Sequence, residues 1–175
     1  MKPFNINEAI QILETTPGVL NALLRNLPEG WADSHEGPDT WSPYDIVGHL
    51  IHGEKTDWIP RMQMILDEGS SKPFPDFDRE AQFRDSKGKS LFQLLDRFEE
   101  LRKKNISELK RQKLTEADFS KTGLHPDFGE VTLQQLLSTW VVHDLGHLRQ
   151  IARVLAKQYK EEIGPWAEYL PVVSE

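Results

Sequence analysis

The stretch from residue 132 to about residue 159 constrains the fold most, because its apolar residues return at helical spacing throughout. In an α-helix, residues four positions apart lie on one face, so His143 and His147 point the same way. The apolar stripe on that face consists of Leu136, Trp140, His143, His147, Ile151 and Val154. We therefore predict a long helix that turns two imidazoles toward a core.

An inward pair of histidines needs an explanation, because a buried polar ring without partners costs free energy. Two neutral imidazoles can hydrogen-bond to acceptors, or both can offer a lone pair to a metal ion. The spacing alone is a weak signal, since a random chain with six histidines in this length contains such a pair in roughly one case in six. Both interpretations stay open at this point.

Two more helices are predicted before residue 67. The first should begin at Asn5 or Asn7 and run toward Leu27, with Pro17-Gly18 kinking or dividing it. The second should begin after Ser42, a good cap, with Pro43 in the favoured first helical position. It should continue to about residue 66, with a disturbance at Pro60.

A third predicted helix, from about residue 90 to 114, brings the number of long amphipathic helices to four. The connections at residues 67–88 and 115–131 are long, and neither contains a convincing strand. We therefore predict an all-α fold, a four-helix bundle with long connections, that forms a single domain over residues 1–175.

The composition limits the classes of function. A net charge of −7 argues against a general nucleic-acid or anionic-membrane binder. No stretch approaches the ~20 apolar residues that span a bilayer, and the first residues lack a signal-peptide core, so we expect a cytoplasmic protein. The absence of cysteine excludes disulfides, thiolate ligands and a cysteine nucleophile. The basic run Arg102-Lys103-Lys104 alternates with acids, and we interpret it as the solvated face of a helix.

A third histidine, His49, is expected on the inward side of the second helix. Bundles build metal sites from side chains on facing helices, so His49, His143 and His147 are the candidate ligands of one divalent ion. Three imidazoles leave a position open for water or substrate, and zinc, nickel, iron and manganese all accept such ligands. His52 is left out of this set, and His125 is expected to be structural or at the rim of a pocket.

Other residue types support the site less directly. Trp41 and Trp140 are expected in the core rather than against a substrate. Glu54 and Asp144 are candidates for a general base or for acceptors that orient the ligands. No Ser-His-Asp arrangement, phosphate-binding loop or HExxH motif is present, so no catalytic residue is assigned from the sequence.

Three segments together resemble the DinB-like superfamily. They are Trp41-Ser42-Pro43-Tyr44-Asp45-Ile46-Val47-Gly48-His49-Leu50, Gly129-Glu130-Val131-Thr132-Leu133 and His143-Asp144-Leu145-Gly146-His147-Leu148-Arg149-Gln150-Ile151. The resemblance implies a four-helix bundle that holds a divalent metal, with His49, His143 and His147 at the ligand positions.

The same resemblance suggests several activities and selects none. The superfamily includes damage-inducible proteins of unassigned activity, transferases and isomerases that use bacillithiol or mycothiol, and proteins assigned as metal-dependent hydrolases. Many are homodimers. We therefore expect a metal-dependent enzyme that activates a thiol or water toward a small electrophilic substrate, with Arg61 or Arg149 as candidates to hold a low-molecular-weight thiol. The alternative is a non-catalytic bundle that acts as a binding or stress-response module.

Overall fold

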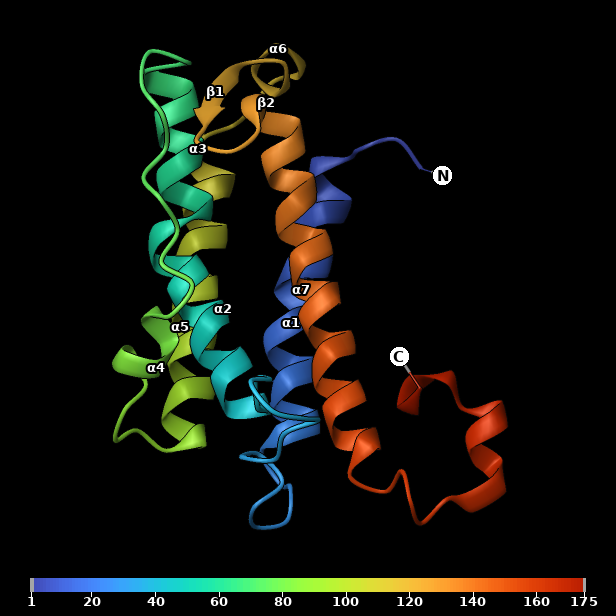
Figure 1. Ribbon diagram of the computed structural model, residues 1–175. Coiled ribbons are helices and arrows are strands. Elements are labelled where there is room, and N and C mark those ends of the chain that lie inside the picture. The colour runs from blue at the N-terminus through green and yellow to red at the C-terminus, as the bar shows by residue number, and fades with distance from the viewer. Residues whose placement is uncertain (1, 175) are drawn as a thin grey trace.

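Four helical units pack side by side in the computed structural model, which describes residues 2–174 (Figure 1). The units are α1 (Ile6–Leu24), α2 (Pro43–Thr56) continued by α3 (Trp58–Asp67), α5 (Leu91–Arg111) and α7 (Leu133–Lys157). The predicted four-helix bundle with long connections is confirmed.

Local capping fixes where the helices begin. The Asn5 side chain accepts hydrogen bonds from the backbone N–H groups of the first turn of α1. Ser42, Ser90 and Thr132 each form a capping box with the side chain three residues later, at the starts of α2, α5 and α7. All four caps satisfy amide groups that would otherwise have no helical partner.

The two prolines within the predicted helices act differently. Pro17 lies inside a continuous α1, so the helix is not divided there. Pro60 lies in the first turn of α3, where a missing N–H costs little. In an uninterrupted helix its ring would clash with the carbonyl of Thr56, and the chain avoids this by separating α2 from α3 at Asp57, which has φ −105° and ψ −72°. The disturbance expected at Pro60 therefore falls at the preceding turn.

The expectation that no strand is present is wrong. The connection before α7 contains α6 (Glu116–Phe119) and an antiparallel hairpin of β1 (Thr122–His125) and β2 (Gly129–Thr132). Each strand has four residues, too few for an alternating pattern to be visible in the sequence. Gly129 has a positive φ of 73°, which glycine adopts without steric cost, at the turn between the strands.

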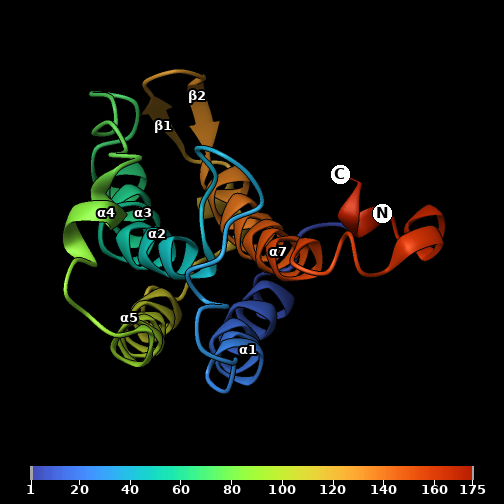
Figure 2. The same cartoon turned by 60° about the horizontal axis from the view of Figure 1, so that its bottom comes forward.

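The other long connection determines the topology. From the end of α3 the chain runs back along the outside of α3 and α2, as Figure 1 shows, and then forms α4 (Ala81–Asp85) before α5. The helical unit α2–α3 and α5 therefore run in the same direction, opposite to α1 and α7. Seen toward its end in Figure 2, the bundle has α5 beside α1 and α2, and α7 beside α1 and α2–α3.

Beyond α7 the chain forms two short 3₁₀ helices, η1 (Gly164–Tyr169) and η2 (Pro171–Val173). Figure 2 shows this segment on the side of α7 away from the hairpin. No helix within residues 2–174 has both the length and the apolar character that crossing a bilayer requires.

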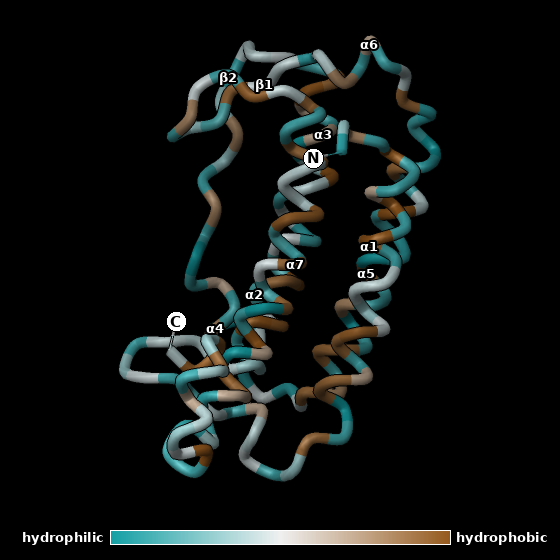
Figure 3. Tube along the Cα trace, turned by 90° about the vertical axis from the view of Figure 1, so that its right-hand side faces the viewer, coloured by the Kyte–Doolittle hydropathy of each residue, from teal (hydrophilic) through white to brown (hydrophobic). Residues whose placement is uncertain are grey.

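The core consists of two apolar clusters with a charged layer between them. In Figure 3 hydrophobic residues recur along the helices, whereas the connections are mostly hydrophilic. The cluster nearer the hairpin includes Trp58 and Trp140, and the other includes Leu50 and Phe98. Between these clusters lie four buried polar side chains: Glu54 from α2, Arg102 and Asn105 from α5, and Asp144 from α7.

Arg102 is the centre of that layer, so its assignment to a solvated face is wrong. The side chain is 1% exposed, whereas Lys103 and Lys104 are exposed as predicted. Arg102 donates to Glu54 from Nε (3.1 Å) and Nη2 (2.7 Å), and to Asp144 from Nη1 (2.6 Å) and Nη2 (3.0 Å). Consecutive helical residues point about 100° apart, so one member of a charged run can face inward.

Two neighbours complete the layer. Arg102 Nη1 also donates to the Leu13 carbonyl at 2.8 Å, which is free because Pro17, four residues later, has no N–H. The Trp140 indole donates to Glu54 at 3.1 Å. The layer therefore joins all four helical units and satisfies every N–H group of a buried guanidinium.

Candidate metal centre

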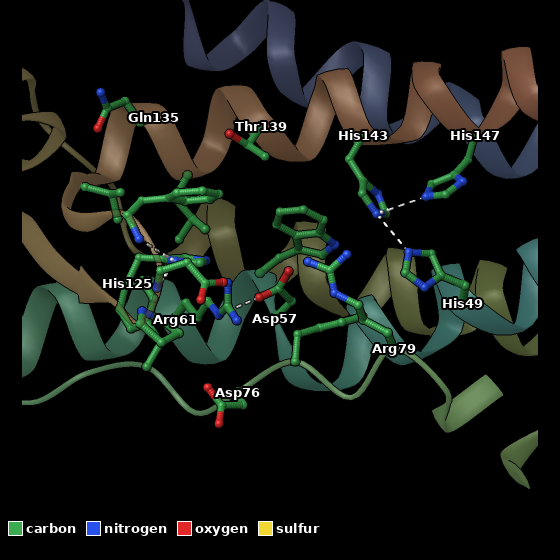
Figure 4. Close-up of a pocket in the computed structure, with 18 of the residues that line it drawn as sticks. His49, Asp57, Arg61, Asp76, Arg79, His125, Gln135, Thr139, His143 and His147 are labelled. Atoms are coloured by element: carbon green, nitrogen blue, oxygen red, sulfur yellow. Dashed lines mark hydrogen bonds and ion pairs between the residues drawn. The ribbon is translucent and has the colours of Figure 1, made fainter.

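Three imidazoles meet between α2 and α7. The Nε2 atom of His143 lies 3.1 Å from Nε2 of His49 and 3.2 Å from Nε2 of His147. The ligand atoms of the three rings all lie within 4.8 Å of one another. Figure 4 shows the three side chains pointing toward a common position, His49 from α2 and the other two from α7. The structure therefore brings together the three histidines that the sequence singled out.

Aromatic packing holds two of these rings. The His49 ring lies 4.8 Å from the Trp41 ring and 5.4 Å from the Phe77 ring, measured between centroids. The His143 ring meets Trp58 edge-on at 5.1 Å, and Trp58 stacks on Trp140. The Nδ1 atoms of His49 and His143 are buried and have no hydrogen-bond partner within the described chain. Van der Waals contact, rather than a hydrogen bond to Nδ1, therefore sets the orientation of both rings.

The third ring is fixed by a hydrogen bond. His147 Nδ1 lies 2.8 Å from the side-chain oxygen of Gln150, one turn further along α7. An amide oxygen can only accept, so Nδ1 carries the proton and Nε2 keeps its lone pair. The ring nitrogen that faces the other two histidines is therefore the one that can bind a cation.

Burial keeps the imidazoles neutral. Loss of solvation, with a smaller contribution from neighbouring imidazoles, lowers the pKa of His49 and His143 to about 3. Burial also lowers the pKa of His147, although the hydrogen bond to Gln150 opposes this shift. At neutral pH all three rings therefore offer lone pairs instead of carrying charge.

This arrangement fits a divalent transition metal. Zinc–nitrogen bonds of 2.0–2.1 Å in tetrahedral geometry place ligand nitrogens about 3.3 Å apart. The two Nε2 separations of 3.1 and 3.2 Å are close to this value. Neutral imidazole is an accepted ligand for zinc, nickel, iron and manganese, so the donor set does not distinguish among them.

A cavity of about 520 Å³ opens from the histidines toward the hairpin. Its walls are largely aromatic and aliphatic, with polar groups at intervals. The residues that line it include the three histidines, Trp41, Trp58, Phe74, Phe77, Leu136, Val131, Arg61, Asp57, Arg79 and His125. Gln135 and His143 are eight residues apart on α7, so the cavity extends about 12 Å along that helix from His143 toward the hairpin.

Two candidate acids lie elsewhere. Glu54 and Asp144 are fully buried, do not line the cavity and bind Arg102. Burial raises the pKa of Glu54, and the charge of Arg102 opposes that shift. Neither carboxylate reaches a ligand ring or the cavity, so their expected roles as a general base or as acceptors for the ligands are wrong.

The structure also places the two tryptophans and two of the remaining histidines that the sequence analysis considered. Trp140 is completely buried, as expected. Trp41 is partly buried: it packs against the core cluster that includes Leu50 and Phe98, and it also lines the cavity beside His49, so its assignment to the core is only partly right. His52 packs on Phe77 outside the three-histidine cluster. His125 lies at the hairpin end of the cavity and also shapes the turn, because its Nδ1 accepts from the backbone amides of residues 127 and 128.

Of the two arginines considered, one lines the cavity. Arg61 Nε lies 2.5 Å from Asp57, and its guanidinium covers the Phe74 ring, whereas Arg149 is not part of the lining. Sequence reasoning missed Arg79 and Phe77, which reach the cavity from the connection after α3. Only the alternation of aromatic and charged residues in that connection could have drawn attention to them.

Comparisons with known proteins agree with this fold. The sequence model of the DinB superfamily matches residues 12–151. YfiT from Bacillus subtilis, described as a probable metal-dependent hydrolase with an unusual four-helix bundle topology, superposes with a TM-score of 0.74 at 24% identity over 94% of each chain. TT2238, described as a four-helix bundle protein, gives 0.56 at 19% identity over 85% of this chain and 98% of its own. No curated protein matches the sequence.

Proposed function

Because this chain belongs to the DinB superfamily and its three histidines converge at the end of a cavity, we propose that it is a divalent-metal-dependent enzyme acting on a small molecule. In this proposal His49, His143 and His147 are the metal ligands. The observation that carries it is the convergence of three neutral Nε2 atoms at a position open to a cavity. A purely structural site would be closed by a fourth protein ligand.

The bound ion would lower the pKa of a water molecule or thiol and so supply a nucleophile at neutral pH. The chain's own residues contribute the surroundings. Trp41, Trp58 and Phe77 exclude bulk water from one side of the histidines, and the apolar wall toward the hairpin accommodates the substrate body. Gln150 maintains the His147 tautomer that leaves Nε2 available.

Hydrolysis is the reaction we favour, and thiol transfer is the second. The printed description of YfiT as a probable metal-dependent hydrolase supports the first, and the resemblance to thiol-dependent members supports the second. The ion pairs of Arg102 with Glu54 and Asp144 favour a third possibility, a metal-binding protein without catalysis, because they remove the two carboxylates that the sequence offered as a general base.

The first test is metal content. Untagged protein purified with metal-supplemented buffers should contain close to one equivalent of transition metal, measured by mass spectrometry, and His143→Ala with His147→Ala should contain almost none. His52→Ala is the matched control, since this histidine is near the cluster but outside it, and should retain the metal. Wild-type protein that takes up no zinc, nickel, iron or manganese would refute the proposal.

Activity assays on the metal-loaded protein then distinguish hydrolysis from thiol transfer. Hydrolysis requires turnover of small esters or amides without added thiol, whereas thiol transfer requires turnover that depends on a low-molecular-weight thiol and an electrophile. Metal bound in full with neither activity would indicate the non-catalytic protein. The expected homodimer remains a prediction, and light scattering on the purified protein would test it. The expected cytoplasmic location also remains a prediction.

A further inference from the structure

Arg79 is a cation in the cavity that the structure gives no acid partner. Figure 4 shows its side chain extending from the connection after α3 into the cavity, between Asp57 and the three histidines. Within residues 2–174 Arg79 forms no ion pair, whereas Arg61, the other arginine of the lining, is bound to Asp57 and to the Pro75 carbonyl. Arg79 is therefore the cavity cation whose donors remain available to a ligand.

The neighbouring acids are engaged or directed elsewhere. Asp78, which precedes Arg79, pairs with Arg84 at 2.5 Å. Asp76 and Asp127 also line the cavity, but Figure 4 shows Asp76 pointing away from the histidines, and Asp127 lies on the turn at the opposite end. Arg79 thus lies near the histidine end of the cavity, with none of these carboxylates bound to it.

The charge balance at that end is positive. An imidazole that binds a metal does so in its neutral form, and the ion pair of Asp57 with Arg61 contributes no net charge. A divalent ion held by the histidines would add two positive charges to that of Arg79. Water screens the charge of the exposed Arg79, so the ion position enclosed by the imidazoles would supply most of the positive field, and the two together attract an anion.

The rest of the cavity is suited to an apolar group. Trp58, Phe74, Phe77, Leu136 and Val131 line it between the histidines and the hairpin. About 12 Å along α7 accommodates a body the size of one aromatic ring with a short chain. The polar group of such a molecule would then lie at the histidine end.

We propose that the cavity binds small carboxylates with an apolar body, and that Arg79 is the substrate-binding residue that recognises the carboxylate beside the metal position. This inference rests on the proposed function and names the substrate class of the same site. A guanidinium presents two parallel N–H donors to a carboxylate, and this geometry gives charge-assisted hydrogen bonds that a neutral amide cannot form as well.

The test compares two ligands of equal shape, 3-phenylpropanoate and 3-phenylpropanamide, by isothermal titration calorimetry. Zinc-loaded and metal-free protein are titrated separately, after their zinc content has been measured. Wild-type protein should bind the carboxylate about tenfold more tightly than the amide. Arg79→Met should lose about tenfold in affinity for the carboxylate and little for the amide, and Arg79→Lys should fall between them.

Arg97→Met is the matched control, because Arg97 is an exposed arginine on α5, paired with Glu100 and outside the cavity. It should bind both ligands as the wild type does. Arg79 is exposed, so its variants should fold normally, which circular dichroism verifies.

Equal affinity for the two ligands in zinc-loaded wild type, or a carboxylate preference that survives Arg79→Met, would overturn the inference and leave the metal proposal intact. Protein that binds no metal refutes the proposed function instead. The metal-free titrations then still decide the role of Arg79, because its contribution to carboxylate binding is measured there without the ion.

Discussion

The buried charged layer allows a sharp prediction about stability. Arg102→Met replaces the guanidinium by an apolar side chain and removes the five hydrogen bonds that Arg102 donates to Glu54, Asp144 and Leu13. Two carboxylates then remain buried without a cation. Breaking a buried ion pair by removing one partner costs about 3–5 kcal/mol, a large part of the roughly 5–15 kcal/mol by which domains are stable.

The loss should depend on pH. Burial raises the pKa of Glu54 and the Arg102 charge opposes that rise, so removing Arg102 should raise the pKa further. An acid whose pKa is higher in the folded than in the unfolded state binds its proton preferentially when folded, and its burial therefore costs most above that pKa. The destabilisation should be largest near about pH 7 and should shrink as the pH falls toward the unfolded value of about 4.3.

Urea unfolding followed by far-ultraviolet circular dichroism, at about pH 7 and about pH 4.5, measures both effects. Arg97→Met on the same helix is the control, since its pair with Glu100 is exposed, and it should change the unfolding free energy by no more than about 0.5 kcal/mol. Replacing the whole charged set, with Glu54→Gln and Asp144→Asn added to Arg102→Met, should recover about half of the loss.

The reasoning is wrong if Arg102→Met stays within about 1 kcal/mol of the wild type at neutral pH. It is also wrong if the loss does not change with pH, because a pure packing defect has no reason to follow the titration of a carboxylate. Failure of the neutral triple variant to recover stability would show that shape, instead of uncompensated charge, dominates this layer.

Three other substitutions test separate parts of the structure. Gly18→Ala should raise the unfolding free energy by about 0.5–1 kcal/mol in urea titrations, because a new Cβ meets no atom within 4 Å and alanine favours the helix. Gly123→Ala should lower it by about 1–3 kcal/mol in the same assay, since the Cβ would lie 2.6 Å from the Phe74 ring. Gln150→Leu should weaken metal binding by about 10–100-fold in chelator competition, through loss of the hydrogen bond that fixes His147, with little change in unfolding; unchanged metal affinity would contradict the proposed role.

Much of the fold was predictable because its determinants are local. The caps at Ser42, Ser90 and Thr132 act within three residues, and the helical period shows which side of each helix faces inward. The hairpin was missed because its strands are short and are supported by distant residues, such as Phe74, whose backbone N–H donates to Leu124 at 2.8 Å.

In the candidate site, too, the sequence located the residues whose placement depends on helical periodicity and missed those whose placement depends on tertiary packing. The i and i+4 spacing placed His143 and His147 on one face of α7, and the inward face of the second helix added His49, in agreement with the family resemblance. Periodicity could not reveal that Glu54 and Asp144 face Arg102 instead of the histidines. It also could not place Trp41 and Arg79 at the cavity, because both lie in connections whose path is set by what they pack against.

The sequence by itself therefore determined the elements: where four helices begin, which faces are apolar, and that two imidazoles share one of those faces. The tertiary structure decided which charges are buried together and which remain available in the cavity. The physical reason is the sequence separation over which each interaction acts. Caps and helical periods act within a few residues, whereas the carboxylate partners of Arg102 are 42 and 48 residues away in the chain and are selected only when α2, α5 and α7 pack together.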